Sequence, residues 1–246
     1  MDLKKEIFSF GGQWNVVHLP EKPNGFAIML IGDTNHYVDE QTSLWLQNPE
    51  RLQLINQLVQ QGYTIFYSHL YGRHWGSDKT VEFLKQLYAY MIRKEILNPR
   101  VHLLAEGMGA LTALKMMERI PEWIRSAAFL SPCIDLKQYF SSEKKNRVFY
   151  KKLQKELAES YEVPEEKVAS HIIEPFSIKD FHNTIPLKIW HSTNRTAYPV
   201  LEHSRPYEAH REVINAPISL SIHLFEKRFT IYDAIGRFYH IHEKNL

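Results

Sequence analysis

The chain has 246 residues, 44% of them hydrophobic and 24% charged, so it is long enough to bury a large core and too apolar to be disordered. Its 30 basic residues are interleaved with 28 acidic ones, and the resulting net charge of +2 gives no reason to expect a nucleic-acid partner. No segment approaches the run of about 18 apolar residues that a membrane span needs. The N-terminus lacks the apolar core of a signal peptide, and the single cysteine, Cys133, excludes an internal disulfide. We therefore expect a cytoplasmic protein that binds neither nucleic acid nor a membrane.

The predicted elements alternate between strands and helices after a short antiparallel start. Residues 6–10 and 14–19 read as two strands joined by a turn at Gly11 and Gly12. From residue 26 onward, continuous apolar runs alternate with segments of helical periodicity. The further strands are predicted at 26–32, 63–70, 101–105, 126–132, 186–192 and 218–225, and the helices between them at 49–61, 78–97 and 110–117. This order predicts the α/β class, with a mostly parallel sheet that is covered by helices on both faces.

One charged helical region interrupts this alternation. A first helix within it carries Phe149, Leu153 and Leu157 on one face, and a second helix is predicted to begin at Pro164. Because the region separates two core strands, we expect a lid over the carboxyl edge of the sheet, where open α/β sheets bind ligands. Residues 1–246 are then a single domain with a helical lid insertion at about 135–185.

A sharp turn follows the strand at 101–105. The strand ends in Glu106, Gly107, Met108 and Gly109, and a helix of small residues begins at once. A strand, a tight turn and a helix are the setting of the nucleophile elbow, G-x-S-x-G, of serine hydrolases. In this chain Gly107 stands where the serine would be, and glycine adopts the strained backbone of such a turn without penalty.

Four segments, in the right order, resemble the α/β-hydrolase fold, and in particular bacterial single-domain esterases of the prolyl-oligopeptidase-like kind. The segments are residues 54–78, 131–136, 159–178 and 185–204. The resemblance implies a nucleophile, an acid and a histidine at fixed places. The nucleophile position falls on Gly107, the acid position on Arg195, and the histidine loop reads 226–229, which contains Arg228 but no histidine.

Acyl transfer in this fold requires an oxygen nucleophile, a base that removes its proton, and a carboxylate that orients the base. Glycine has no side chain that can attack, and arginine is always protonated, so it cannot be the orienting anion. The pattern therefore predicts a pseudoenzyme: a catalytically inactive hydrolase-like protein with a binding or regulatory role.

The vacated pocket retains the features of an anion site. The N–H of Met108, at the start of a helix, would point to the former oxyanion position, and a second donor would come from near Gly32 and Asp33. With Arg195 and Arg228 expected to approach the same place, a small carboxylate or phosphate is the predicted ligand. The alternative is that the two arginines pair with Glu106, Asp33 or Asp135 and fill the site.

Three other hypotheses stay open. An active esterase or acyl hydrolase could use Ser131 or Cys133 with His191, although a buried cysteine and a helix-capping Asp135 explain these residues as well. A lyase would need no serine. A protein partner could dock on the amphipathic lid. The 13 histidines show no metal-binding spacing, so we expect neither a metal nor another cofactor.

Overall fold

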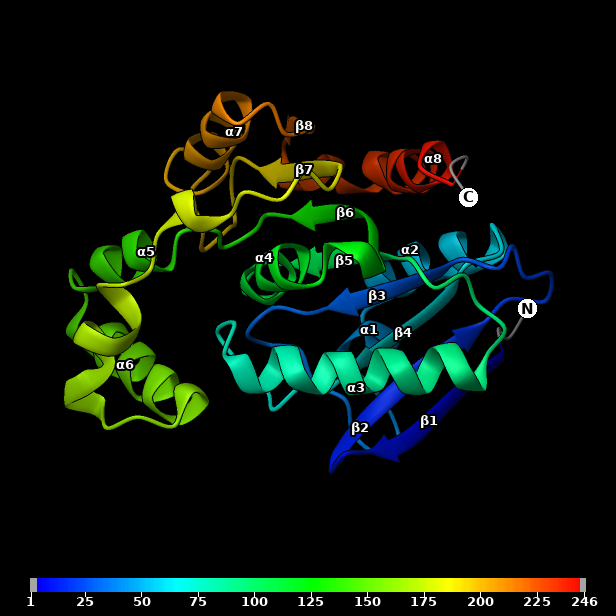
Figure 1. The fold of residues 1–246 in the computed structure, drawn as a ribbon, viewed down its shortest axis with the longest axis horizontal. Helices are drawn as coiled ribbons and strands as arrows, with labels where there is room; N and C mark the ends of the chain where they lie inside the picture. The colour runs from blue at the N-terminus through cyan, green and yellow to red at the C-terminus, as the bar shows by residue number, and fades with distance from the viewer. Residues whose placement is uncertain (1–3, 244–246) are drawn as a thin grey trace.

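The computed structural model describes residues 4–243 and contains one eight-stranded sheet in the order β1-β2-β4-β3-β5-β6-β7-β8 (Figure 1). Strand β2 is antiparallel to β1 and β4, and all other neighbours are parallel. The mostly parallel sheet predicted from the sequence is confirmed. The strands are β1 Lys4–Phe10, β2 Gln13–Leu19, β3 Ala27–Ile31, β4 Thr64–Ser68, β5 Val101–Glu106, β6 Ile124–Leu130, β7 Leu187–Ser192 and β8 Ile218–His223.

Helices cover both faces of the sheet, with α3 and α4 on one face and α2 and α8 on the other (Figure 1). The α-helices are α1 Leu44–Gln47, α2 Pro49–Gln60, α3 Asp78–Lys94, α4 Gly109–Arg119, α5 Leu136–Glu143, α6 Arg147–Tyr161, α7 Ser204–Val213 and α8 Tyr232–Ile241. Shorter 3₁₀ or π turns are η1 Pro121–Trp123, η2 Glu165–Lys167, η3 Ala169–Ile173, η4 Ile178–Asp180 and η5 Phe225–Ile231. Between residues 4 and 243, no helix is long and apolar enough to cross a membrane.

The continuous apolar strands reflect burial on both faces. In β3, Met29 and Ile31 pack into the core beneath α3 and α4, whereas Ile28 and Leu30 pack into the core beneath α2 and α8. All four side chains are almost completely buried. Neither face of β3 meets water. Its sequence is therefore apolar throughout and does not alternate between apolar and polar residues.

The region between β6 and β7, residues 131–186, is called the helical insertion here and lies beyond the carboxyl ends of the strands (Figure 1). Its first predicted helix is divided in two, because the Asn146 side chain caps a new helix, α6. Leu153 and Leu157 are buried, as their spacing predicts, but Phe149 is 56% exposed. The second predicted helix is wrong in type: Pro164 is extended (φ −60°, ψ 145°) and precedes a 3₁₀ turn and a π turn.

Buried histidines make this fold sensitive to acid. Burial lowers the pKa of His36 to about 4 and that of His102 to about 3. Because the unfolded chain takes up protons near pH 6.5 while the folded chain does not, the stabilisation is complete above pH 6.5 and is lost as the pH falls toward these folded values. We predict that urea titrations from pH 7 to pH 4 lose about 3 kcal/mol of unfolding free energy per such histidine.

The comparison that isolates this effect is His102→Asn against His171→Asn, since His171 lies on the surface. The first variant should flatten the pH dependence of unfolding and the second should leave it unchanged. Equal slopes in both variants would contradict the assignment.

Candidate functional site

The turn after β5 has the backbone of a nucleophile elbow. Gly107 has a left-handed φ of +51°. Its N–H donates to the carbonyl of Leu130 (3.1 Å), and its carbonyl accepts from the N–H of Cys133 (2.9 Å), so the turn is fixed to the end of β6. The prediction that Gly107 occupies a strained turn is confirmed.

The register of the sheet brings Asp33 to this turn. Strand β3 pairs with β5 so that Ile31 lies opposite Ala105, and two residues further along each chain come Asp33 and Gly107. The Oδ1 atom of Asp33 accepts hydrogen bonds from the Met108 N–H (2.8 Å) and from the Tyr198 hydroxyl (3.0 Å). A carboxylate therefore already receives the N–H at the start of α4, where the helix dipole favours an anion.

Asp33 also takes the space that a side chain at position 107 would need. A Cβ atom built on Gly107 would lie 2.1 Å from the Asp33 Cγ and 2.2 Å from its Oδ1. The predicted neighbours Gly32, Asp33, Gly107 and Met108 are indeed together, but their expected roles change. Asp33 is not part of a donor pair for an external anion, because its own carboxylate is the anion.

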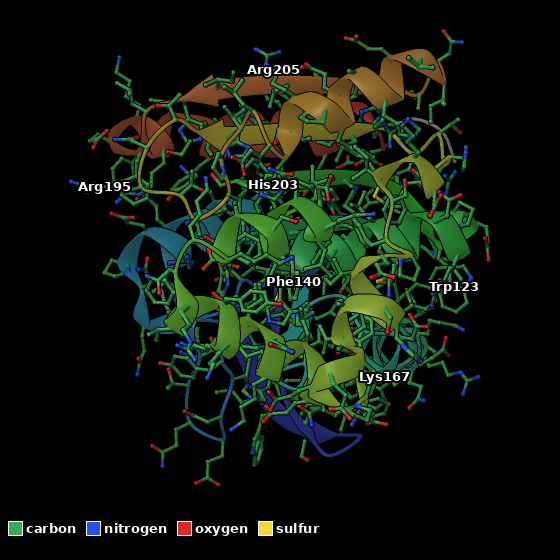
Figure 2. All side chains as sticks on the ribbon, turned by 90° about the vertical axis from the view of Figure 1, so that its left-hand side faces the viewer. Trp123, Phe140, Lys167, Arg195, His203 and Arg205 are labelled. Atoms are coloured by element: carbon green, nitrogen blue, oxygen red, sulfur yellow. The ribbon has the colours of Figure 1, made fainter. Side chains whose placement is uncertain are left out.

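The two arginines do not converge on this carboxylate. Arg228 binds both carboxylate oxygens of Glu50, and its Nη1 donates to the Phe225 carbonyl (2.8 Å). Arg195 lies at the periphery of the carboxyl edge (Figure 2), with its side chain 68% exposed and its Nε 3.9 Å from a Glu226 oxygen.

The expectation that these arginines hold a ligand at Met108, or pair with Asp33, Glu106 or Asp135, is therefore wrong. The 3₁₀ turn η5 places Arg228 beside the first turn of α2, where Glu50 lies. The family resemblance predicted where Arg195 and Arg228 lie along the chain, but it could not predict the direction in which their long side chains extend.

Glu106 instead pairs with Arg51 of α2, which the sequence analysis did not single out. Two hydrogen bonds join them, Nε to Oε2 at 3.1 Å and Nη2 to Oε1 at 2.6 Å. Burial raises the pKa of Glu106, and Arg51 opposes that rise. The helix dipole disfavours a positive charge near the N-terminus of a helix, which is where Arg51 lies in α2. The position of Arg51 in the sequence therefore indicated that an anionic residue from elsewhere in the fold pairs with it.

His191 does not serve Ser131 or Cys133. Its Nε2 donates to the Tyr198 carbonyl (2.7 Å), which leaves Nδ1 to accept from the Ser204 hydroxyl (2.6 Å). The Ser131 hydroxyl oxygen accepts from the Ser192 N–H (3.1 Å). Cys133 is fully buried, and burial raises the pKa of its thiol, which disfavours the reactive thiolate.

The Ser204–His191 pair has the spacing of a nucleophile and its base, yet both side chains are 0% exposed. The bond joins the end of β7 to the start of α7 and offers no surface to a substrate. Asp135 caps α5, as expected, by accepting from the Gln138 N–H (2.9 Å). These residues are explained by packing and capping.

Aromatic side chains close the space above the turn. Tyr198 lies against Tyr139 (5.1 Å between ring centroids), and Tyr139 stacks on Trp75 (5.4 Å). Glu156 of α6 accepts from the Trp75 indole N–H (3.0 Å) and pairs with Arg73. The helical insertion is thereby fixed over the turn. Nowhere in the described part of the chain do three His, Cys, Asp or Glu side chains form a group that could hold a metal ion.

The contact between Asp33 and position 107 predicts a large cost for Gly107→Ala. The matched control is Gly12→Ala, because Gly12 is also left-handed (φ +73°) but has no atom within 4 Å of a built Cβ. We expect about 1 kcal/mol of destabilisation at Gly12 from the backbone alone and about 3 kcal/mol at Gly107, where overpacking is added. Urea denaturation measures both.

The same substitution in an Asp33→Ala background tests the cause. Without the carboxylate, Gly107→Ala should cost no more than Gly12→Ala does. An unchanged cost of about 3 kcal/mol in that background would show that Asp33 is not what excludes a side chain from the turn.

Comparison with known proteins agrees with this architecture. A family model described as serine aminopeptidase, S33 (Hydrolase_4), matches residues 52–223. No curated protein has a matching sequence. Solved structures are similar in fold at low identity, and the chain spans only 36% of a putative dipeptidyl aminopeptidase IV from Bacteroides ovatus (TM-score 0.71, 12% identity, 98% of this chain covered).

Two further structures are similar over nearly the whole chain. Est1E from Butyrivibrio proteoclasticus has a TM-score of 0.66 at 12% identity, with 97% of this chain and 98% of that chain covered. An acylaminoacyl peptidase from Pyrococcus horikoshii has a TM-score of 0.73 at 10% identity, with 100% and 42% covered. Since the family model matches well over half of the residues, this chain belongs to the Hydrolase_4 family of α/β-hydrolases, described as serine aminopeptidase, S33.

Proposed function

We propose that this α/β-hydrolase acts by binding and not by cleaving a substrate. One observation carries the proposal: the Asp33 carboxylate occupies the place of the nucleophile side chain and accepts the hydrogen bond that an oxyanion would receive from Met108. Negative charge develops on the substrate oxygen during acyl transfer, and a fixed carboxylate in that position repels it. The geometry opposes the reaction at its most demanding step.

The positions that would carry the other two reacting groups support the same conclusion. Arg195 is exposed, and Arg228 is held by Glu50 and the Phe225 carbonyl. Neither group accepts a proton at neutral pH, so neither replaces a base or its orienting acid. The alternative, an enzyme with a displaced nucleophile, has no geometric support, because His191 is bonded to Ser204 and to Tyr198 instead.

The direct test is hydrolysis by the intact chain. We expect no turnover of p-nitrophenyl butyrate or of an aminoacyl p-nitroanilide above the buffer rate, and no labelling by a fluorophosphonate probe. The reason is that His191 is not hydrogen-bonded to Ser131 or Cys133, and its hydroxyl partner, Ser204, is completely buried.

Three variants locate the source of any signal: Ser131→Ala, Cys133→Ala and Ser204→Ala. The matched control is Ser126→Ala, since Ser126 forms a similar buried bond with His102 (2.8 Å) within the core strands. Turnover or labelling that is lost in one of the three variants and retained in the control would overturn the proposal and identify the nucleophile.

A further inference from the structure

A cavity of about 190 Å³ lies at the carboxyl ends of β5, β6, β7 and β8, between the segments to which the family resemblance assigns the acid and the histidine. It is separate from the Asp33 contact. Its walls are largely aromatic and include Trp45, Trp190, Phe225 and Tyr232. Ligand sites in proteins combine such apolar walls with a few polar groups that fix orientation.

Two hydroxyl donors of this cavity lack an acceptor. The Tyr232 hydroxyl and the Ser131 hydroxyl proton have no acceptor among residues 4–243, although the Ser131 oxygen accepts from Ser192. Trp45 contributes only to the wall, because its indole nitrogen is inaccessible even to a water molecule. A ligand bound in the cavity can supply the acceptors that the two hydroxyls lack.

The charged groups leave one further donor open. Arg228 and Glu50 form one pair, and Arg51 and Glu106 form another, so the four lining charges cancel. Arg51 uses Nε and Nη2 for Glu106, while its Nη1 has no hydrogen bond to any described residue. A guanidinium with an open nitrogen favours an oxygen anion over a neutral acceptor.

We propose that this cavity binds a small aromatic carboxylate, an assignment that deepens the proposed binding function. The ring lies among the aromatic walls, and the carboxylate accepts from the donors of Tyr232, Ser131 and Arg51. A carboxylate has about four acceptor sites on two oxygens, which is enough for these three donors. The volume suits one ring with a polar substituent, because a cavity of about 150 Å³ takes up benzene alone.

The test titrates the intact protein with three ring compounds of similar size: benzoate, benzamide and toluene. We expect saturable binding of benzoate by calorimetry or by ligand-observed NMR, with benzamide at least about tenfold weaker, since charge-assisted hydrogen bonds are the stronger ones. Toluene, which has no acceptor, should bind most weakly of the three.

Two variants remove one donor each with little change of volume: Tyr232→Phe and Ser131→Ala. Each should weaken benzoate binding about fivefold, the usual effect of one hydrogen bond. Tyr150→Phe is the matched control, because Tyr150 packs against Phe140 in the helical insertion, does not line this cavity and should leave binding unchanged. Circular dichroism establishes that each variant is folded, and Tyr232→Phe decides the matter if Ser131→Ala does not fold.

The proposal is overturned if benzoate shows no binding at millimolar concentration, if benzamide binds equally well, or if both donor variants bind as the unmodified chain does. Absence of binding together with absence of hydrolysis would remove this ligand class and leave the non-catalytic assignment standing. Turnover of esters would instead refute the non-catalytic assignment, whatever the result with benzoate.

Discussion

The hydrogen bond from the Met108 N–H to the Asp33 carboxylate determines what the site can do. The N-terminus of α4 favours an anion, and in this chain the Asp33 carboxylate supplies it internally. Because the carboxylate must come close to Met108, position 107 has room only for glycine. Tyr198 donates to the same oxygen atom, so the loop after β7 is bound to the closed turn as well.

The other charged residues at the carboxyl edge pair with one another and not with Asp33. Arg51 with Glu106, and Arg228 with Glu50, form two pairs at the ends of β5 and β8, and each arginine binds both carboxylate oxygens of its partner. Such pairs need their hydrogen bonds, since an unpaired charge in a partly buried place is strongly destabilising. The pairs border a cavity without closing it, and the Tyr232, Ser131 and Arg51 donors that line the cavity have no acceptor among the described residues.

Much of the fold follows from the sequence, because β3 to β6 are predominantly apolar runs bounded by turns, as expected of strands that are buried on both faces. The left-handed turn at Gly107 was predictable for the same local reason. The directions of Arg195 and Arg228 were not, since long side chains reach partners that depend on the tertiary fold. Pro164 is a local exception: proline is favoured at the first position of a helix, but here it stands one residue earlier, as the cap of a 3₁₀ turn.

The central claim is that an internal carboxylate closes the elbow, and a crystal structure of the unliganded protein, grown without small carboxylates or phosphate, tests it most directly. The account predicts Asp33 Oδ1 near the Met108 nitrogen, at the 2.8 Å found here, with no other group between them. An Asp33 side chain turned toward solvent, with a water molecule or chloride ion at the Met108 N–H, would contradict it.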